Sequence, residues 1–215
     1  MGSVNTTGQI SGTATITLFG ANMLNKIKFY LVSLFGWWRE LGPYDTKRAY
    51  KYYSKFIYQP EKFQEYKKRG FKVQVPYQDW EVFGSYLTGE KKQCHIGIDL
   101  HNFEIKSAKQ GSSFEYQYHR FGGVKKLEKD ADSKHLFVSY SNEYKDITVR
   151  LVHGTDLNYI FQSWKPGLIQ NYKSSKQRYR KSIPYRVIVD QGEVIMRIKG
   201  GSLDFHIDNE TKLLQ

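Results

Sequence analysis

"YRVIVDQGEVIMRIKGGSLDFHID", residues 185–208, is the stretch on which the predicted fold depends. Its three runs of alternating apolar and polar side chains are joined by two short turns that contain glycine. Such turns between alternating runs are typical of hairpins, so the stretch predicts a three-stranded antiparallel meander. In its middle run we expect Val194, Met196 and Ile198 to face the core, and Ile195 to be the one apolar side chain on the wet face.

The same two-residue period extends upstream of this meander. Runs rich in β-branched and aromatic residues alternate with turns of Gly, Ser, Asn and charged residues, which predicts further strands. These runs are "FKVQV" (71–75), "VFGSYL" (82–87), "CHIGIDL" (94–100), "FEYQYHRF" (114–121), "HLFVSY" (135–140) and "ITVRLV" (147–152). One short helix is expected near 155–164, ending before Pro166.

Residues 21–70 show helical spacing instead. Ala49 and Tyr53 belong to a series of apolar and aromatic side chains that recur every three or four residues, with lysines on the other side. Pro60 is typical of the first residue of a helix, and Gly70 of the residue that ends one. This segment is therefore expected to hold two or three amphipathic helices.

The first residues of the chain differ from both patterns. Residues 1–20 hold no charged side chain and are rich in Gly, Ser and Thr, so we expect an extended arm that needs a partner surface to become ordered. The predicted class is α+β, with a mostly antiparallel sheet or sandwich. It comprises the arm (1–20), a helical segment (21–70) and a β-rich domain (71–215).

An apolar run, "FYLVSLFGWW" at 29–38, raises the question of membranes. It is too short to span a bilayer, which takes about 20 apolar residues, and no small-residue cleavage site follows it. Leu31, Leu34 and Trp38 share one helical stripe, so we expect this helix to bind a partner protein. The alternative is that Trp37 and Trp38 lie in a membrane interface. Localisation stays open, with the cytoplasm or a virion as candidates.

The net charge of +12 is the strongest global signal, because a field of that sign favours polyanionic partners. Neither helix capping nor amphipathic packing requires the basic residues between 173 and 181. We expect a loop there that contacts nucleic acid or an acidic partner, and the alternative is a solvated connector. The residues concerned are Lys173, Lys176, Arg178, Arg180 and Lys181.

Catalytic motifs are weak in this sequence. There is no glycine-rich phosphate loop ending in Gly-Lys-Ser/Thr and no nucleophile elbow, and the single cysteine excludes a paired zinc site. Strand alternation in "HIGIDLH" (95–101) would place Asp99 and His101 on one face, where His119 is a candidate third ligand. Polar residues alternate on any half-wet strand, however, so we assign no catalytic residue, metal or cofactor.

These observations favour a non-catalytic structural or assembly subunit of a larger complex, such as a viral particle. Other protein subunits would bind the arm and the aromatic helix, and the basic segments would contact nucleic acid or an acidic partner. A second hypothesis is a membrane-associated component of a secretion or transfer apparatus. The third is a nucleic-acid-processing enzyme that uses the region of Asp99 and His101.

Overall fold

The computed structural model describes residues 45–92 and 97–207. The predicted arm and the helix with Leu31, Leu34, Trp37 and Trp38 lie outside these residues, so both stay predictions. The boundaries proposed at residues 20 and 70 likewise stay predictions.

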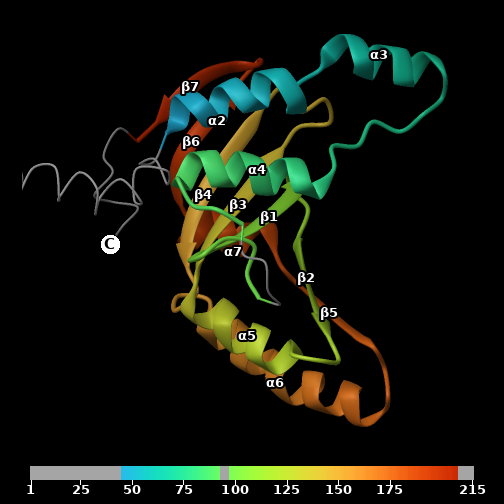
Figure 1. Ribbon diagram of the computed structural model, residues 1–215, viewed down its shortest axis with the longest axis vertical. Helices are drawn as coiled ribbons and strands as arrows, with labels where there is room; N and C mark the ends of the chain where they lie inside the picture. The colour runs from blue at the N-terminus through green and yellow to red at the C-terminus, as the bar shows by residue number, and fades with distance from the viewer. Residues whose placement is uncertain (1–44, 93–96, 208–215) are drawn as a thin grey trace, which may run out of the picture. The chain divides into compact units, whose positions relative to one another are not determined.

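A five-stranded sheet forms the centre of the described chain, with the strand order β1-β3-β4-β6-β7 (Figure 1). The first two strands in this order are parallel, and every other neighbouring pair is antiparallel. The predicted α+β class with a mostly antiparallel sheet is therefore confirmed. The strands are β1 (Phe103–Lys109), β3 (Lys134–Tyr140), β4 (Ile147–His153), β6 (Glu193–Lys199) and β7 (Ser202–His206).

Two strands lie outside this sheet and pair with each other. They are β2 (Phe114–His119) and β5 (Arg178–Ile183), which form a two-stranded antiparallel ribbon. Strand β2 belongs to the connection between the parallel strands β1 and β3, together with helix α5 (Gly123–Asp132). Parallel neighbouring strands need a long crossover connection, and here this connection contains α5.

One hydrophobic cluster joins the sheet to the helices that precede it in the chain. Helix α2 (Thr46–Tyr52) continues into a π-helical turn, η1 (Tyr53–Ile57), and α4 (Tyr77–Thr88) follows. Ala49, Tyr53 and Ile57 are fully buried at four-residue intervals, which confirms the predicted helical stripe. Tyr53 is also satisfied by a hydrogen bond, because its hydroxyl donates to the Tyr144 backbone oxygen at 2.8 Å.

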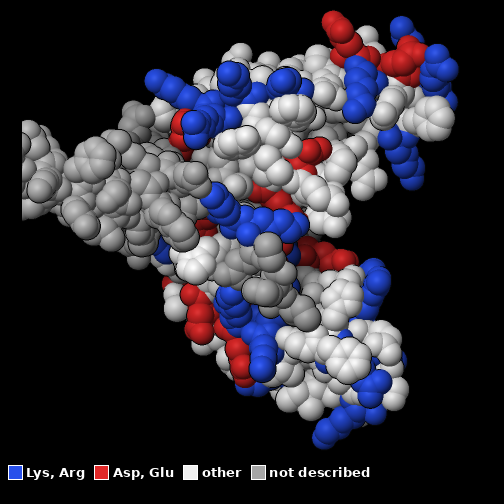
Figure 2. All heavy atoms as spheres, in the orientation of Figure 1, with Lys and Arg blue, Asp and Glu red and all other residues white. Residues whose placement is uncertain are grey.

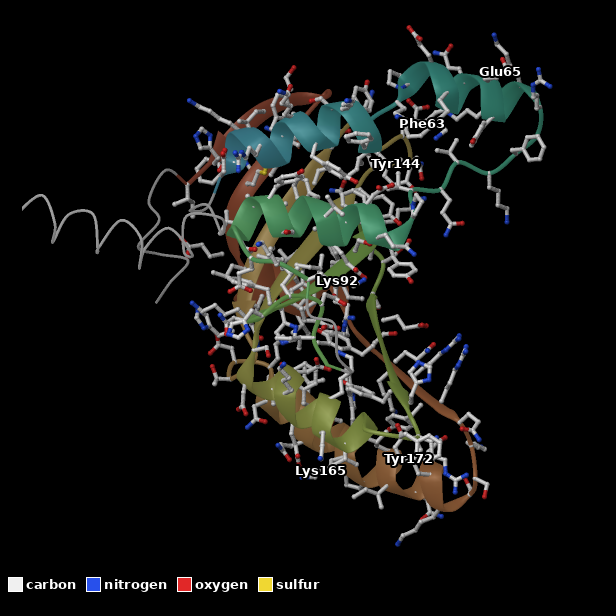
Figure 3. All side chains as sticks on the ribbon, in the orientation of Figure 1. Phe63, Glu65, Lys92, Tyr144, Lys165 and Tyr172 are labelled. Atoms are coloured by element: carbon white, nitrogen blue, oxygen red, sulfur yellow. The ribbon has the colours of Figure 1, made fainter. Side chains whose placement is uncertain are left out.

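Helix α3 (Pro60–Lys68) begins at the proline, as predicted. It is held through Phe63, whose ring centroid lies 5.6 Å from that of Tyr144 (Figure 3). The basic side chains of α2 and α3 are exposed, and Figure 2 shows Lys and Arg along both helices. These lysines therefore occupy the wet side of packed helices.

A second hydrophobic cluster joins β2, β5 and α5 to the last two helices. These are α6 (Asn158–Lys173) and α7 (Tyr185–Gln191). Leu127 and Ala131 of α5 and Phe161 and Leu168 of α6 are buried in it. Both clusters include strand residues, so the central sheet is covered by two separate groups of helices.

Several of the predicted strands were wrong. Residues 82–87 belong to α4, where Trp80, Phe83 and Leu87 are buried at helical spacing. Residues 71–75 form no strand, and 185–190 form α7 after Pro184. Short apolar runs do not distinguish strand from helix by period alone, which explains the errors at 82–87 and 185–190; residues 71–75 are irregular.

The meander is correspondingly changed. Strands β6 and β7 pair as predicted, but β4 takes the place beside β6 that was assigned to 185–190. Ile195 is 1% exposed, contrary to expectation, because a strand with neighbours on both sides in a covered sheet is buried on both faces. The helix expected near 155–164 begins at Asn158 and continues through Pro166 to Lys173, and α5 was not predicted at all.

The close approach of β4 to the end of α5 generates a stability prediction. A Cβ atom at Gly154 would lie 2.3 Å from the Asp130 carbonyl oxygen and 2.6 Å from that of Ser133. Relieving this clash would require the backbone at Asp130 and Ser133 to shift, so Gly154→Ala is expected to lower the free energy of unfolding by about 1–3 kcal/mol. Urea denaturation followed by circular dichroism measures this loss.

Gly84→Ala is the matched control. Its Cβ would meet the end of the flexible Ile105 side chain at 2.7 Å, and a helix interior gains about 1 kcal/mol when Gly becomes Ala. We expect the two effects to offset each other to within about 1 kcal/mol. Equal losses for the two variants would contradict the account of Gly154.

A candidate active site at the start of strand β1

Charged side chains that are buried or half-buried gather at the start of β1. Glu104 and Lys106 are two residues apart on this strand, so both point to the same face. Asp99 lies in the segment just before the strand. Between the two charged residues, Ile105 points to the opposite face and packs against α4 beside Gly84.

The carboxyl groups of Asp99 and Glu104 each accept a hydrogen bond from the backbone of the other's segment. The Asp99 backbone N–H donates to Glu104 Oε2 at 3.2 Å, and the Ile105 backbone N–H donates to Asp99 Oδ2 at 2.9 Å. Burial and then the negative charge of Glu104 raise the pKa of Asp99 to about 7. Asp99 is therefore held in a position where its own negative charge is disfavoured at neutral pH.

Glu104 is almost fully buried and is held by two lysines. Lys106 forms an ion pair with Glu104 Oε1, and Lys126 Nζ lies 2.9 Å from the same oxygen. Burial alone would raise the pKa of Glu104, but the two positive charges outweigh it and lower this pKa to about 2. Glu104 therefore stays ionised in the interior of the protein.

Helix α5 supplies Lys126 and holds it in place. Asp130, one helical turn further on, accepts a hydrogen bond from Lys126 Nζ at 2.9 Å. Burial disfavours the charged form of Lys126, but Glu104 and Asp130 outweigh it and raise its pKa. Burial, followed by the charge of Glu104, raises the pKa of Asp130. The lysine thus bridges two buried acids from different elements.

His135 of β3 lies behind this cluster in a neutral form. Its Nε2 lies 2.7 Å from the Asp130 backbone oxygen, which only accepts, so Nε2 carries the proton. Its Nδ1 then accepts from the Tyr116 hydroxyl at 2.9 Å. Burial lowers the pKa of His135 to about 4. This histidine is a structural link between β3, α5 and β2.

Two further side chains border the cluster. Lys106 Nζ lies 4.8 Å from the centroid of the Tyr116 ring, a cation–π distance. Glu81 of α4 accepts from Lys92 Nζ at 2.7 Å, and Lys92 lies near α4 in Figure 3. The charge of Glu81 also contributes to the raised pKa of Asp99, so a third carboxylate acts on the site.

Within residues 45–92 and 97–207, no three His, Cys, Asp or Glu side chains converge as a metal-holding group. Both oxygens of Glu104 are already engaged, Oε1 by Lys106 and Lys126 and Oε2 by the Asp99 backbone N–H. Mg²⁺ keeps several waters and binds through one or two carboxylates together with substrate phosphates, so Asp99 is the carboxylate of this pair that could take part in such a site. Oxygen ligands of this kind would not suit a structural zinc ion.

The metal set considered from the sequence is not brought together. His101 is exposed, and His119 of β2 accepts at Nε2 from Gln117 Nε2 at 3.0 Å. The strand predicted for 94–100 was wrong in its described part, because residues 97–101 form no regular strand, only an isolated bridge between Lys92 and Leu100. Sequence reasoning also missed the partners of Asp99 in "DLHNFEIK", where an acid and a lysine flank one apolar residue.

The predicted basic loop is only partly a loop. Lys173 is the last residue of α6, and Lys176 lies in the following turn. Arg178, Arg180 and Lys181 belong to β5, so the prediction of a loop was wrong for them. All of these basic side chains are exposed, and whether they contact nucleic acid stays a prediction.

No protein-family model matches this chain, and no curated protein matches it. None of the described helices is long and apolar enough to cross a membrane. The function must therefore be inferred from the geometry and charge of the described residues.

The buried His135 generates a pH prediction. Its pKa is about 4 in the folded state and about 6.5 when unfolded, so the unfolded chain binds the proton more tightly. The stability that this difference provides is complete above pH 6.5 and is lost as the pH falls towards 4. Between pH 7 and 4.5 the loss amounts to about 2 kcal/mol.

A comparison with His135→Gln isolates this contribution, because glutamine does not titrate. Urea unfolding at several pH values should show that the free-energy gap between wild type and variant shrinks by about 2 kcal/mol between pH 7 and 4.5. A gap that stays constant over this range would show that His135 is not held neutral.

Proposed function

We propose that this chain is a nucleic-acid-processing enzyme that hydrolyses phosphodiester bonds, with Asp99, Glu104 and Lys106 as its reacting residues. The observation that carries the proposal is the pair of adjacent carboxyl groups with a lysine beside them at the start of β1. It develops the third of the hypotheses drawn from the sequence, with Glu104 and Lys106 in place of His101.

The electrostatics of the two carboxyl groups favour a cation between them. The pKa of Asp99 is raised because a buried negative charge lies close to another one. Asp99 would hold a divalent cation beside Glu104, and Asp99 would then be ionised at neutral pH. Such an ion polarises a phosphate and lowers the pKa of a bound water, which is the chemistry that hydrolysis of a phosphodiester needs.

Lys106 supplies a fixed positive charge next to the carboxyl groups. Its ammonium group is held between Glu104 and the face of the Tyr116 ring, so it needs little reorganisation during a reaction. In this place it would stabilise the negative charge that develops on a phosphate in the transition state. Lys126 is a positioning residue, because it neutralises Glu104 and fixes its carboxylate from α5.

The charge of the whole chain supports a polyanionic substrate. A net charge of +12 attracts nucleic acid, and its backbone presents the bond that the site would hydrolyse. The arm and the aromatic helix of the assembly and membrane hypotheses lie in residues 1–38, outside the described residues, and the exposed basic residues between 173 and 181 suit the assembly hypothesis as well as an enzyme. Both stay predictions.

An activity assay with paired variants tests this proposal. Purified protein is incubated with duplex DNA, single-stranded DNA and RNA, each with Mg²⁺ or Mn²⁺ and with a chelator. We expect metal-dependent cleavage by the wild type, and a rate at least about 100-fold lower for Asp99→Asn. Asp132→Asn is the control, because Asp132 is an exposed carboxylate at the end of α5.

Stability measurements separate a lost reaction from a lost fold. Asp99→Asn removes a carboxylate whose charged form is disfavoured, so at pH 8 it should be at least as resistant to urea as the wild type. A folded wild-type chain that cleaves none of these polymers with either metal would overturn the proposal. Full activity in Asp99→Asn would overturn it as well.

A further inference from the structure

The ribbon formed by β2 and β5 has one apolar and one polar face. Its apolar face packs into the second hydrophobic cluster and includes Tyr116 and Tyr118, both fully buried. The opposite face is made entirely of polar and charged side chains. It comprises Glu115, Gln117, His119, Arg178, Arg180 and Ser182, which we call the polar ribbon face.

Side chains on the polar ribbon face hold one another in place. Arg180 Nε donates to Gln117 Oε1 at 3.0 Å, and Gln117 Nε2 donates to His119 Nε2 at the same distance. Arg180 Nε also lies 3.8 Å from Glu115 Oε1. The long side chains are thus already ordered across the two strands, which reduces the entropy lost when they bind a partner.

The platform beneath this face is rigid. Tyr116 and Tyr118 lie against the ring of Trp164 from α6, with centroid distances of 5.7 and 6.4 Å. Tyr172 of α6 donates from its hydroxyl to the His119 backbone oxygen at 2.5 Å, at the far end of the ribbon (Figure 3). A ribbon held in this way can present its polar side chains at fixed positions.

We propose that the polar ribbon face enters the major groove of duplex DNA and reads the edges of the bases. This inference rests on the proposed function, because it takes nucleic acid as the substrate. The major groove of B-form DNA, about 12 Å wide, admits a two-stranded ribbon. The major groove of A-form RNA is too deep and narrow for side chains to read, so the face fits DNA.

The side chains present are those that distinguish bases. A guanidinium group pairs with guanine, a primary amide with adenine, and a carboxylate accepts from the amino group of cytosine. Arg178 and Arg180, Gln117 and Glu115 supply these three groups in neighbouring positions on one face. A face that served only to bind phosphates would need basic side chains, and the amide of Gln117 and the carboxylate of Glu115 would add nothing to it.

The ribbon is also directly connected to the candidate active site. Tyr116 separates Glu115 from Gln117 in the chain, and Lys106 Nζ lies over its ring. Tyr116 lies on the buried face of the ribbon, so the polar ribbon face and the candidate site are joined through the two sides of the same strand. The exposed lysines Lys173 and Lys176, just before β5, suit phosphate contacts, which position a duplex without reading its sequence.

The test is a binding selection in which no cleavage can occur. Full-length protein is mixed with a randomised duplex DNA library in the presence of a chelator, and the bound fraction is sequenced. We expect the wild type to enrich a short motif, with discrimination on the order of ten- to a hundred-fold at each base pair that is read.

Two variants of opposite design separate base reading from phosphate binding. Gln117→Ala with Arg180→Lys keeps the charge but removes the amide and the planar fork, so the motif should lose its preference at the affected positions while binding to random DNA persists. Lys173→Gln with Lys176→Gln should keep the motif, weaken binding to every sequence and lower the log–log salt slope by about two.

Three outcomes would overturn the inference: no motif enriched by the wild type, an unchanged motif in the first variant, or tighter binding to RNA than to duplex DNA. Cleavage is scored separately. A chain that cleaves DNA without any base preference leaves the proposed function in place and overturns the reading of bases by the ribbon. A chain that selects a motif but cleaves nothing overturns the proposed function and supports the ribbon inference.

Discussion

The buried negative charge of Glu104 is the constraint on which the rest of the described structure depends. An ionised carboxylate in the interior is very costly unless it is paired, and this one is paired twice, by Lys106 from its own strand and by Lys126 from α5. Removing one partner of such a group typically costs about 3–5 kcal/mol. The requirement fixes α5 over the parallel pair β1 and β3, and through Asp130 and His135 it also fixes β2. The position of the ribbon is thus a consequence of how one acid is neutralised.

Part of this architecture could be predicted from the sequence, because a hydrophobic pattern that extends over several turns identifies a helix better than a short apolar run does. The stripe that contains Ala49 and Tyr53 extends over several turns, and Pro60 marks a boundary with a direct steric cause, so both were predicted correctly. The runs at 82–87 and 185–190 are each too short to distinguish alternation from a helical face. A proline stands directly before each of these helices, Pro76 before α4 and Pro184 before α7, and this helix-start signal was not used in the prediction.

The candidate site could be predicted less well, because its contacts join distant parts of the chain. Glu104 and Lys126 are 22 residues apart, and they meet only because a helix that was not predicted crosses over the sheet. No spacing rule connects them. Within "DLHNFEIK" the signal was present in the sequence. Glu104 and Lys106 lie on one face of a strand, and the residues beside Glu104 in the chain, Phe103 and Ile105, are apolar. In that region the histidines were weighed and no site was assigned, and His101 is exposed.

Strands β2 and β5 are separated by more than fifty residues of chain, which include β3, β4 and the whole of α6. During synthesis, the residues that make up the carboxylate cluster all lie ahead of β5, so the cluster's chain is complete while β2 still has no partner strand. Pairings between such distant segments pay the largest entropy of loop closure and tend to form late in folding. Until β5 arrives, β2 is an unpaired strand edge with exposed aromatic residues, a state that invites association between chains. For a protein with this ribbon, the slow closure of one strand pair sets the window in which the nascent chain is most prone to aggregate.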